Sequence, residues 1–301
     1  MKPFTIVVDT SCDLSPETIR EHDIEVVPIP FVLDGAEHSA GYWQDISASA
    51  FYDALRGGGT AKTSQINPDA FVKYFTAYAK QGQDAVFILL SSRLSATYQS
   101  SQIALGEVRE SYPHCGVYPI DSIGATSINA LLAMMAVQKR AEGCSAAETA
   151  AFLEEQKHNV LGFFTVDDLM YLHRGGRLSK LSAIGGSLLG VKPVLSIQPD
   201  GSLALKEKIR GRESALKFLA GTLQRSLSPG ASLGTVCIAH SDCQADAQKL
   251  AGLVKADYQV RQLEIITLGP VVGAHVGPGA VILVYESGMT RGEYEGKYYG
   301  K

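Results

Sequence analysis

Two hydroxyl-rich segments could bind an anion. Ser91 and Ser92 come directly after an apolar run and precede a helical pattern, which places their hydroxyls beside free backbone N–H groups at the positive end of a helix. Thr63 and Ser64 form a second hydroxyl pair before another helical pattern. A serine N-cap is the alternative for the first segment, but this segment holds more hydroxyls than one cap requires. We therefore expect a carboxylate or phosphate site.

His275 lies in the glycine-rich, apolar segment 269–279, which we expect to form a loop. A lone histidine is usually a structural residue, but an unpaired imidazole would be costly in such a setting, so a ligand role is equally favoured. The segment Asp9–Asp13 follows the first predicted strand, and ligands of parallel sheets bind beyond the carboxyl ends of the strands. For this segment, helix capping and local backbone hydrogen bonds are the favoured interpretation.

Two segments are basic. Arg174 and Arg177 flank a pair of glycines, and paired arginines offer the forked geometry that recognises carboxylates and phosphates. The segment Lys206–Arg212 contains four cations and one acid. A solvated surface is the alternative in both cases. For the second segment we expect Arg210 and Arg212 to face a partner rather than to form internal ion pairs.

The elements that position these residues alternate between short, continuous apolar runs and helical patterns. Continuous runs are typical of strands covered by helices on both faces, and the alternation predicts two α/β domains with mostly parallel sheets. We place the domain boundary near residue 160, giving domains 1–160 and 161–301. The predicted strands are Phe4–Val8, Ala85–Leu90, Val160–Val166, Val236–Ala239, Leu263–Thr267 and Val281–Tyr285, and the predicted helices include Pro68–Lys80, Ser95–Glu110, Ile128–Arg140, Ala146–Lys157, Glu213–Leu223 and Ala245–Lys255.

Composition narrows the function classes. Of 301 residues, 46% are hydrophobic and 19% are charged, which indicates a globular protein, and a net charge of −4 without a basic cluster argues against nucleic acid as a partner. The five cysteines have no C-x-x-C spacing, so we expect no metal or disulfide framework. We expect no secretion leader, and Leu131–Val137 is too short to span a bilayer, so we predict a cytoplasmic protein.

Several enzyme signatures are absent, including G-x-x-x-x-G-K-[ST] and H-E-x-x-H. One rival hypothesis is an acyl-ester hydrolase with Ser92 as nucleophile and His275 as base, for which no orienting acid can be assigned. Another is a binding module for a different small anion, such as a phosphate ester. His240 and Asp242 alone do not make a metal site.

Taken in order, six motifs resemble those of the DegV family. The resemblance spans nearly the whole chain. The motifs are Asp9-Thr10-x-x-Asp13, Thr63-Ser64-Gln65, Ser91-Ser92-x-Leu94-Ser95-x-Thr97-Tyr98-Gln99, Tyr171-Leu172-x-Arg174-Gly175-Gly176-Arg177, Lys208-x-Arg210-Gly211-Arg212 and Gly273-x-His275-x-Gly277-Pro278-Gly279.

The resemblance implies a long-chain fatty acid, such as palmitate or oleate, buried near the domain junction. Thr63 and Ser92 would hold its carboxylate, supported by Ser64, Ser91 and His275, without a buried arginine. The protein would need no cofactor and carry no catalytic residue. It would instead present the carboxylate to a bacterial fatty-acid kinase, which forms the acyl phosphate for phospholipid synthesis. Docking to the kinase would use Arg210 and Arg212, and lipid exchange would involve transient contact with a membrane surface.

Overall fold

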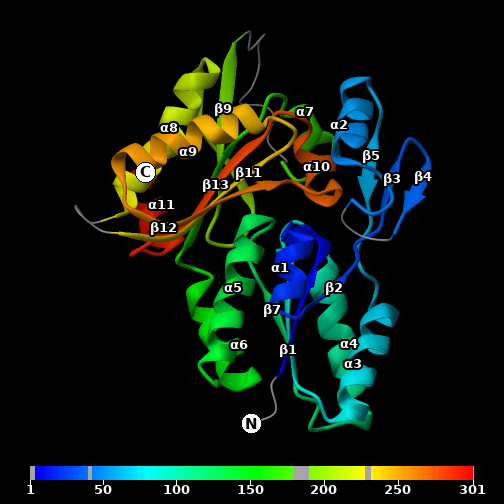
Figure 1. Cartoon of the computed structure of the whole chain (residues 1–301). Coiled ribbons are helices and arrows are strands. Elements are labelled where there is room, and N and C mark those ends of the chain that lie inside the picture. Colours follow the sequence, from blue (N-terminus) through cyan, green and yellow to red (C-terminus); the bar gives the residue numbers. More distant parts are fainter. Residues whose placement is uncertain (1–3, 40–42, 179–189, 228–231, 301) are drawn as a thin grey trace.

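The computed structural model describes residues 4–39, 43–178, 190–227 and 232–300 of the chain. A four-stranded sheet forms in the N-terminal half, a six-stranded sheet in the C-terminal half, and a small three-stranded sheet beside them. Figure 1 shows the two larger sheets one above the other, with helix α5 (Ser127–Ala141) between them. Because α5 packs on strands of both sheets, one helix joins the two halves of this α/β fold.

The four-stranded sheet is parallel throughout, in the order β2-β1-β6-β7. Ile6 and Val8 face α5 and α6, whereas Val7 and Phe87 pack with α3 and α4 on the other face. This burial on both faces explains the continuous apolar runs. The elements are β1 (Thr5–Asp9), β2 (Ile24–Val27), β6 (Ala85–Leu89), β7 (Val117–Asp121), α3 (Pro68–Gln81), α4 (Thr97–Ser111) and α6 (Ala146–Gln156).

The six-stranded sheet has the order β10-β9-β8-β13-β11-β12. Along β13, Val281 and Leu283 join the core under α8 and α9, while Ile282 and Val284 join the core that contains α5. The second face is the one turned toward the N-terminal half. The elements are β8 (Val160–Thr165), β9 (Val191–Ile197), β10 (Leu203–Arg210), α8 (Arg212–Ser226), β11 (Leu233–His240), α9 (Gln244–Asp257), β12 (Val260–Thr267) and β13 (Val281–Glu286).

The small sheet, in the order β4-β3-β5, brings Thr63 to the junction between the two halves. Phe31 pairs with Thr63 at the end of this sheet, and α10 packs against β5. Ser47 caps α2, whose Phe51 and Tyr52 are fully buried. The remaining elements are η1 (Thr10–Cys12), α1 (Pro16–Glu21), β3 (Phe31–Leu33), β4 (Ala36–His38), α2 (Ala48–Arg56), β5 (Ala61–Thr63), α7 (Met170–Arg174), α10 (Pro270–Val276) and α11 (Arg291–Tyr298).

Two details differ from the sequence predictions. The expectation of mostly parallel sheets is wrong for the six-stranded sheet, where only β11 and β12 pair in parallel among the described residues. Apolar periodicity reports burial on both faces, and burial does not fix strand direction. The glycine-rich segment 269–279 is not a loop throughout, because Pro270–Val276 forms helix α10, with proline at its first turn.

Three further expectations concern the chain as a whole. The domain boundary near residue 160 stays a prediction, although β8 begins at Val160. The apolar run Leu131–Val137 lies within α5, and the described residues contain no helix with the length and hydropathy needed to cross a bilayer. All five cysteines are free thiols.

Candidate functional site: an apolar cavity with a polar end

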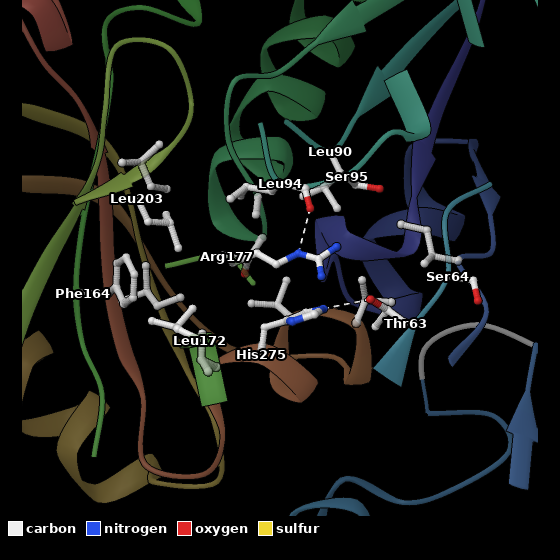
Figure 2. Close-up of a pocket in the computed structure, with 18 residues that line it drawn as sticks. Thr63, Ser64, Leu90, Leu94, Ser95, Phe164, Leu172, Arg177, Leu203 and His275 are labelled. Carbon is white, nitrogen blue, oxygen red and sulfur yellow. Dashed lines mark hydrogen bonds between the residues drawn. The ribbon is translucent and has the colours of Figure 1, made fainter. Parts of the chain in front are cut away.

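A small cavity of about 70 Å³ lies where the two halves of the protein meet. Residues from the six-stranded sheet, from the segments that follow β2, β6 and β7, from β5 and from α10 surround it. Figure 2 shows its polar side chains toward one end and its large apolar side chains toward the other. The lining residues are Ile29, Thr63, Ser64, Leu90, Leu94, Ser95, Ala125, Thr126, Phe164, Leu172, Arg177, Ile197, Leu203, Val271, Val272, His275, Val276 and Ile282.

The apolar end is built by the six-stranded sheet. Phe164 of β8, Ile197 of β9, Leu203 of β10 and Ile282 of β13 line the cavity from the face that packs toward α5. These side chains come from four neighbouring strands, so backbone hydrogen bonding holds this wall in place. Leu172 closes the same end from α7 (Figure 2). The wall excludes water and suits a hydrocarbon chain.

Thr63 and His275 form a hydrogen-bonded pair at the polar end. Thr63 Oγ1 lies 2.8 Å from His275 Nε2, although 212 positions separate the residues in sequence. Either atom can donate, depending on the tautomer of the ring. If Nε2–H donates, the threonine hydroxyl hydrogen is left for an anion. If the hydroxyl donates, the Nδ1–H is left instead. The pair therefore offers one spare donor in both arrangements.

Burial keeps His275 neutral. Burial and, to a smaller extent, the positive charge of Arg177 together lower the pKa of His275 to about 4. Nδ1 is buried and has no hydrogen-bond partner within the described part of the chain. A Cβ added at Gly175 would lie 2.3 Å from Nδ1, so glycine at this position leaves room for the imidazole. A neutral, partly unpaired imidazole suits the binding of an anionic oxygen.

Arg177 supplies the positive charge. Its Nε donates to the Leu94 carbonyl at 2.9 Å and an NH group donates to the Gly175 carbonyl at 2.5 Å. In Figure 2 the guanidinium lies between the Ser95 side of the cavity and His275. Burial lowers the pKa of Arg177, but a guanidinium stays charged at neutral pH. The expectation of a head-group site without a buried arginine is therefore wrong, because this half-buried cation lines the cavity.

A larger outer pocket of about 330 Å³ adjoins the same polar side chains. Thr63, Arg177 and His275 line both this pocket and the inner cavity, so they form the wall between the two. Lys62 and Arg174 add exposed cations to the outer pocket. A group held by the shared wall is therefore within reach of a molecule that enters from outside.

Ser91 and Ser92 have different roles from those expected. They do not line the cavity, whereas Ser95, one turn later, does. Ser91 is fully buried and its Oγ donates to the Gly201 carbonyl at 3.1 Å, across the junction between the halves. The backbone N–H of Ser92 donates to Asp121 at 3.1 Å. The structure thus brings Thr63, Ser64 and His275 to one cavity, places Ser91 in packing between the halves, and places the Ser92 backbone beside Asp121.

The predicted docking residues also separate. Arg210 is exposed at the end of β10. Arg212 is half-buried and pairs with Asp246 at 2.9 Å and with Asp167 at 3.5 Å. Lys206 pairs with Glu295 at 2.5 Å. The expectation that this segment forms no internal ion pairs is therefore wrong for Lys206 and Arg212, because acids from distant elements fold against it.

Sequence reasoning missed three polar lining residues. Arg177 was noticed only as half of a basic pair, and its role in the cavity depends on burial that no local pattern reports. Ser95 belongs to the hydroxyl-rich turn that was singled out. Thr126 gave no signal, since it lies beyond β7 in a turn with φ 50°. Within the described ranges, no three His, Cys, Asp or Glu side chains cluster to hold a metal ion.

The geometry defines an α/β protein with an enclosed apolar cavity and donors at one end, which suits a small amphipathic anion. The family model described as "Uncharacterised protein, DegV family" matches residues 3–287. The chain therefore belongs to the DegV family, as the motifs predicted. A DegV domain-containing protein of Clostridium perfringens is 36% identical over 286 residues, covering 95% of this chain and 98% of that relative.

Solved structures share the fold. DegV from Bacillus subtilis, described as a fatty acid binding protein, is 28% identical with a TM-score of 0.80. A fatty acid binding DegV family protein from Streptococcus agalactiae is 28% identical with a TM-score of 0.82. Each comparison covers 95% of this chain and 99% of the other. The similarity of fold therefore includes both large sheets.

Proposed function

We propose that the protein binds one long-chain fatty acid, such as palmitate or oleate, with its acyl chain in the cavity and its carboxylate at the polar end. The observation that carries this proposal is the division of one cavity into an apolar end and a donor-rich end, in a chain whose similar solved structures are described as fatty acid binding. Sequestering about 14 methylenes at about 0.8 kcal/mol each supplies the gross driving force.

The carboxylate would bind between Thr63, His275 and Arg177, with Ser64 and Ser95 nearby. A carboxylate needs several donors to leave water, and one cation with hydroxyl and imidazole donors meets that need. A cavity of about 70 Å³ is smaller than typical ligand pockets of roughly 300 Å³ or more. Side chains of the wall must therefore move apart as a long acyl chain enters.

The outer pocket supports a carrier role. A carboxylate on the shared wall could be reached from outside while the acyl chain stays buried. We propose that a fatty-acid kinase phosphorylates the carboxylate there, yielding an acyl phosphate for phospholipid synthesis, and that this chain contributes binding and not catalysis. Free cysteines fit a cytoplasmic location, and loading would involve transient contact with a membrane surface.

Arg210 and Arg212 are the proposed docking residues. Exposed charges at such an interface mainly speed and orient the encounter. Arg210→Ala is the cleaner test, because Arg212→Ala also removes ion pairs with Asp246 and Asp167. We expect both variants to keep the bound lipid and to lose most kinase-catalysed phosphorylation, while Arg109→Ala, an exposed arginine on α4, serves as the matched control. Wild-type phosphorylation of the Arg210 variant at low protein concentration would exclude docking through this residue.

Binding itself is tested by titrating the protein with oleate while a fluorescent fatty acid is displaced. Oleate at about 100 times its dissociation constant should stabilise the fold by about 2.7 kcal/mol. Protein stripped of lipid that neither binds the probe nor gains stability from oleate would contradict the proposal.

The hydrolase hypothesis finds less support. It needs Ser92 beside His275, but Ser92 is outside the cavity lining and the described partner of the imidazole is Thr63. Hydrolysis of a chromogenic acyl ester measures this alternative directly. We expect no turnover above that of an unrelated protein.

A further inference from the structure

Asp13 is a buried carboxylate that the proposed binding site does not use. Its side chain is only 4% exposed, at the end of the 3-10 turn η1. Burial raises the pKa of Asp13 to about 7, and the nearby Asp9 acts in the same direction. Keeping an acid in such a place costs stability, so its contacts indicate what the fold gains.

One contact of Asp13 fixes the start of α10. Asp13 Oδ1 accepts a hydrogen bond from the backbone N–H of Gly269 at 2.8 Å, and Gly269 is the N-cap of α10. This contact is close, since a Cβ added at Gly269 would lie 2.5 Å from the same oxygen. The helix that begins there carries His275. Residues of the first half of the chain thereby hold the helix that supplies the imidazole.

The second contact of Asp13 reaches the cavity wall. Thr126 lines the cavity, and its hydroxyl lies near enough to Asp13 to lower the pKa of that carboxyl, although neither Thr126 Oγ1 nor Asp13 Oδ2 makes a well-formed hydrogen bond within the described residues. Thr126 has φ 50° and ψ −121°, an unfavourable conformation for a β-branched residue. Its N–H donates to the Ser11 carbonyl at 2.7 Å. The η1 turn therefore holds a strained wall residue as well as α10.

We infer that Asp13 is a positioning residue for the ligand head group, which sets the place of His275 through its hydrogen bond to Gly269. This inference rests on the proposed fatty-acid binding. Asp13 does not touch the ligand. It joins the N-terminal half, which supplies Thr63, to the helix that supplies His275, and the 2.8 Å bond between those two residues requires both parts to stay in register.

The test uses conservative and non-conservative variants of the full chain. Asp13→Asn keeps an oxygen that accepts from Gly269, whereas Asp13→Ala removes it. We expect oleate affinity, measured by displacement of a fluorescent fatty acid, to fall about tenfold or more in Asp13→Ala and to stay within about threefold of wild type in Asp13→Asn. Glu25→Ala is the matched control. The Glu25 carboxylate accepts a hydrogen bond from the Tyr78 hydroxyl at 2.6 Å, and neither residue lines the cavity.

Two outcomes would overturn the inference. One is wild-type affinity in Asp13→Ala, and the other is an equal loss of affinity in Glu25→Ala, which would make the effect one of general stability. If Asp13→Ala does not fold, Gly269→Ala takes its place, because the added methyl group displaces the carboxylate. We then expect Gly269→Ala to weaken binding about tenfold, and unchanged binding would overturn the inference.

Hydrogen exchange separates this inference from the proposed function. Asp13→Ala, or Gly269→Ala in its place, should speed exchange of the α10 amides in protein without added lipid, and Glu25→Ala should not. If wild-type protein fails to bind any fatty acid, the proposed function fails while the exchange result still reports on α10. If exchange of the α10 amides is unchanged, the positioning role fails even where lipid binds.

Discussion

Two hydroxyl-rich segments of this protein are alike in sequence and different in use. Thr63 and Ser64 line the cavity, and Thr63 hydrogen-bonds to His275. Ser91 instead contacts Gly201 across the junction between the halves, and the Ser92 N–H contacts Asp121 at the end of β7. Both segments lie beside the start of a helix, so local chemistry does not distinguish them. The distinction comes from the second half of the chain. It places helix α10, with the His275 imidazole, against Thr63, and it places the turn between β9 and β10 against Ser91.

The largest expected effect is a pH dependence of folding stability, caused by the buried His275 at the cavity. The pKa of His275 is lowered from 6.5 to about 4, so His275 contributes stability above pH 6.5 that is lost as the pH falls toward 4, an effect of about 3 kcal/mol. The charged group that faces the imidazole is Arg177, and Thr63 is neutral. Between pH 6.5 and pH 4, the free energy of unfolding of wild type should fall by about 3 kcal/mol more than that of His275→Gln. Urea unfolding at several pH values measures this difference. A constant difference between the two proteins would show that the imidazole is not buried as described.

The next effect compares equivalent hydroxyl deletions on the two sides. Thr63→Val should weaken oleate binding by about 1.5 to 3 kcal/mol, because a group hydrogen-bonded to the carboxylate is lost. Ser92→Ala should bind oleate like wild type. The sequence alone predicts the same loss of affinity for both variants. Equal losses would therefore assign Ser92 to the binding site and contradict the difference between the two hydroxyl-rich segments.

Ser91→Ala is expected to have a smaller effect, on stability and not on binding. Its hydroxyl donates to the Gly201 carbonyl, and removing a buried donor costs about 1 to 2 kcal/mol. Urea unfolding should report this cost, with oleate affinity unchanged in the folded variant. A loss of affinity without a loss of stability would assign Ser91 to the ligand.

The smallest effect is expected at the ion pair that spans the same junction. Arg93 and Asp200 lie 3.1 Å apart, with side chains 59% and 52% exposed. Exposed pairs contribute little, so Asp200→Asn should change stability by about 0.5 kcal/mol or less. A change above 2 kcal/mol in urea unfolding would mean that the junction depends on this pair.

The sequence predicted β1, β6, β8, β11, β12 and β13, and burial on both faces leaves long apolar runs in strands such as β6 and β13. It missed β2, β7 and β9, although β9 is largely buried. It also missed β3, β4 and β5, which are three residues long, and β10, whose cations hide the pattern. Helix α10 was not predicted because glycine and proline flank its seven residues, at Gly269 and in Gly277-Pro278-Gly279. Short elements leave too few residues to show a period.

Half of the candidate site followed from residue type and half from tertiary structure. Thr63 and His275 were identified as candidates by their chemistry, and hydrogen bonding over 212 positions then joins them. Arg177 and Thr126 owe their roles to burial between the two halves, which no local pattern encodes. The ion pairs of Arg212 likewise depend on Asp167 and Asp246, acids that only the folded chain brings close.

The most direct test of the central claim is to identify the lipid that the protein carries. Protein expressed in a lipid-containing host is purified, extracted with organic solvent and analysed by mass spectrometry, with Thr63→Val/His275→Ala as the matched variant. We expect about one long-chain fatty acid per wild-type chain and much less in the double variant. Wild-type protein that is stable and free of fatty acid, or a double variant that retains a full complement, would contradict the account.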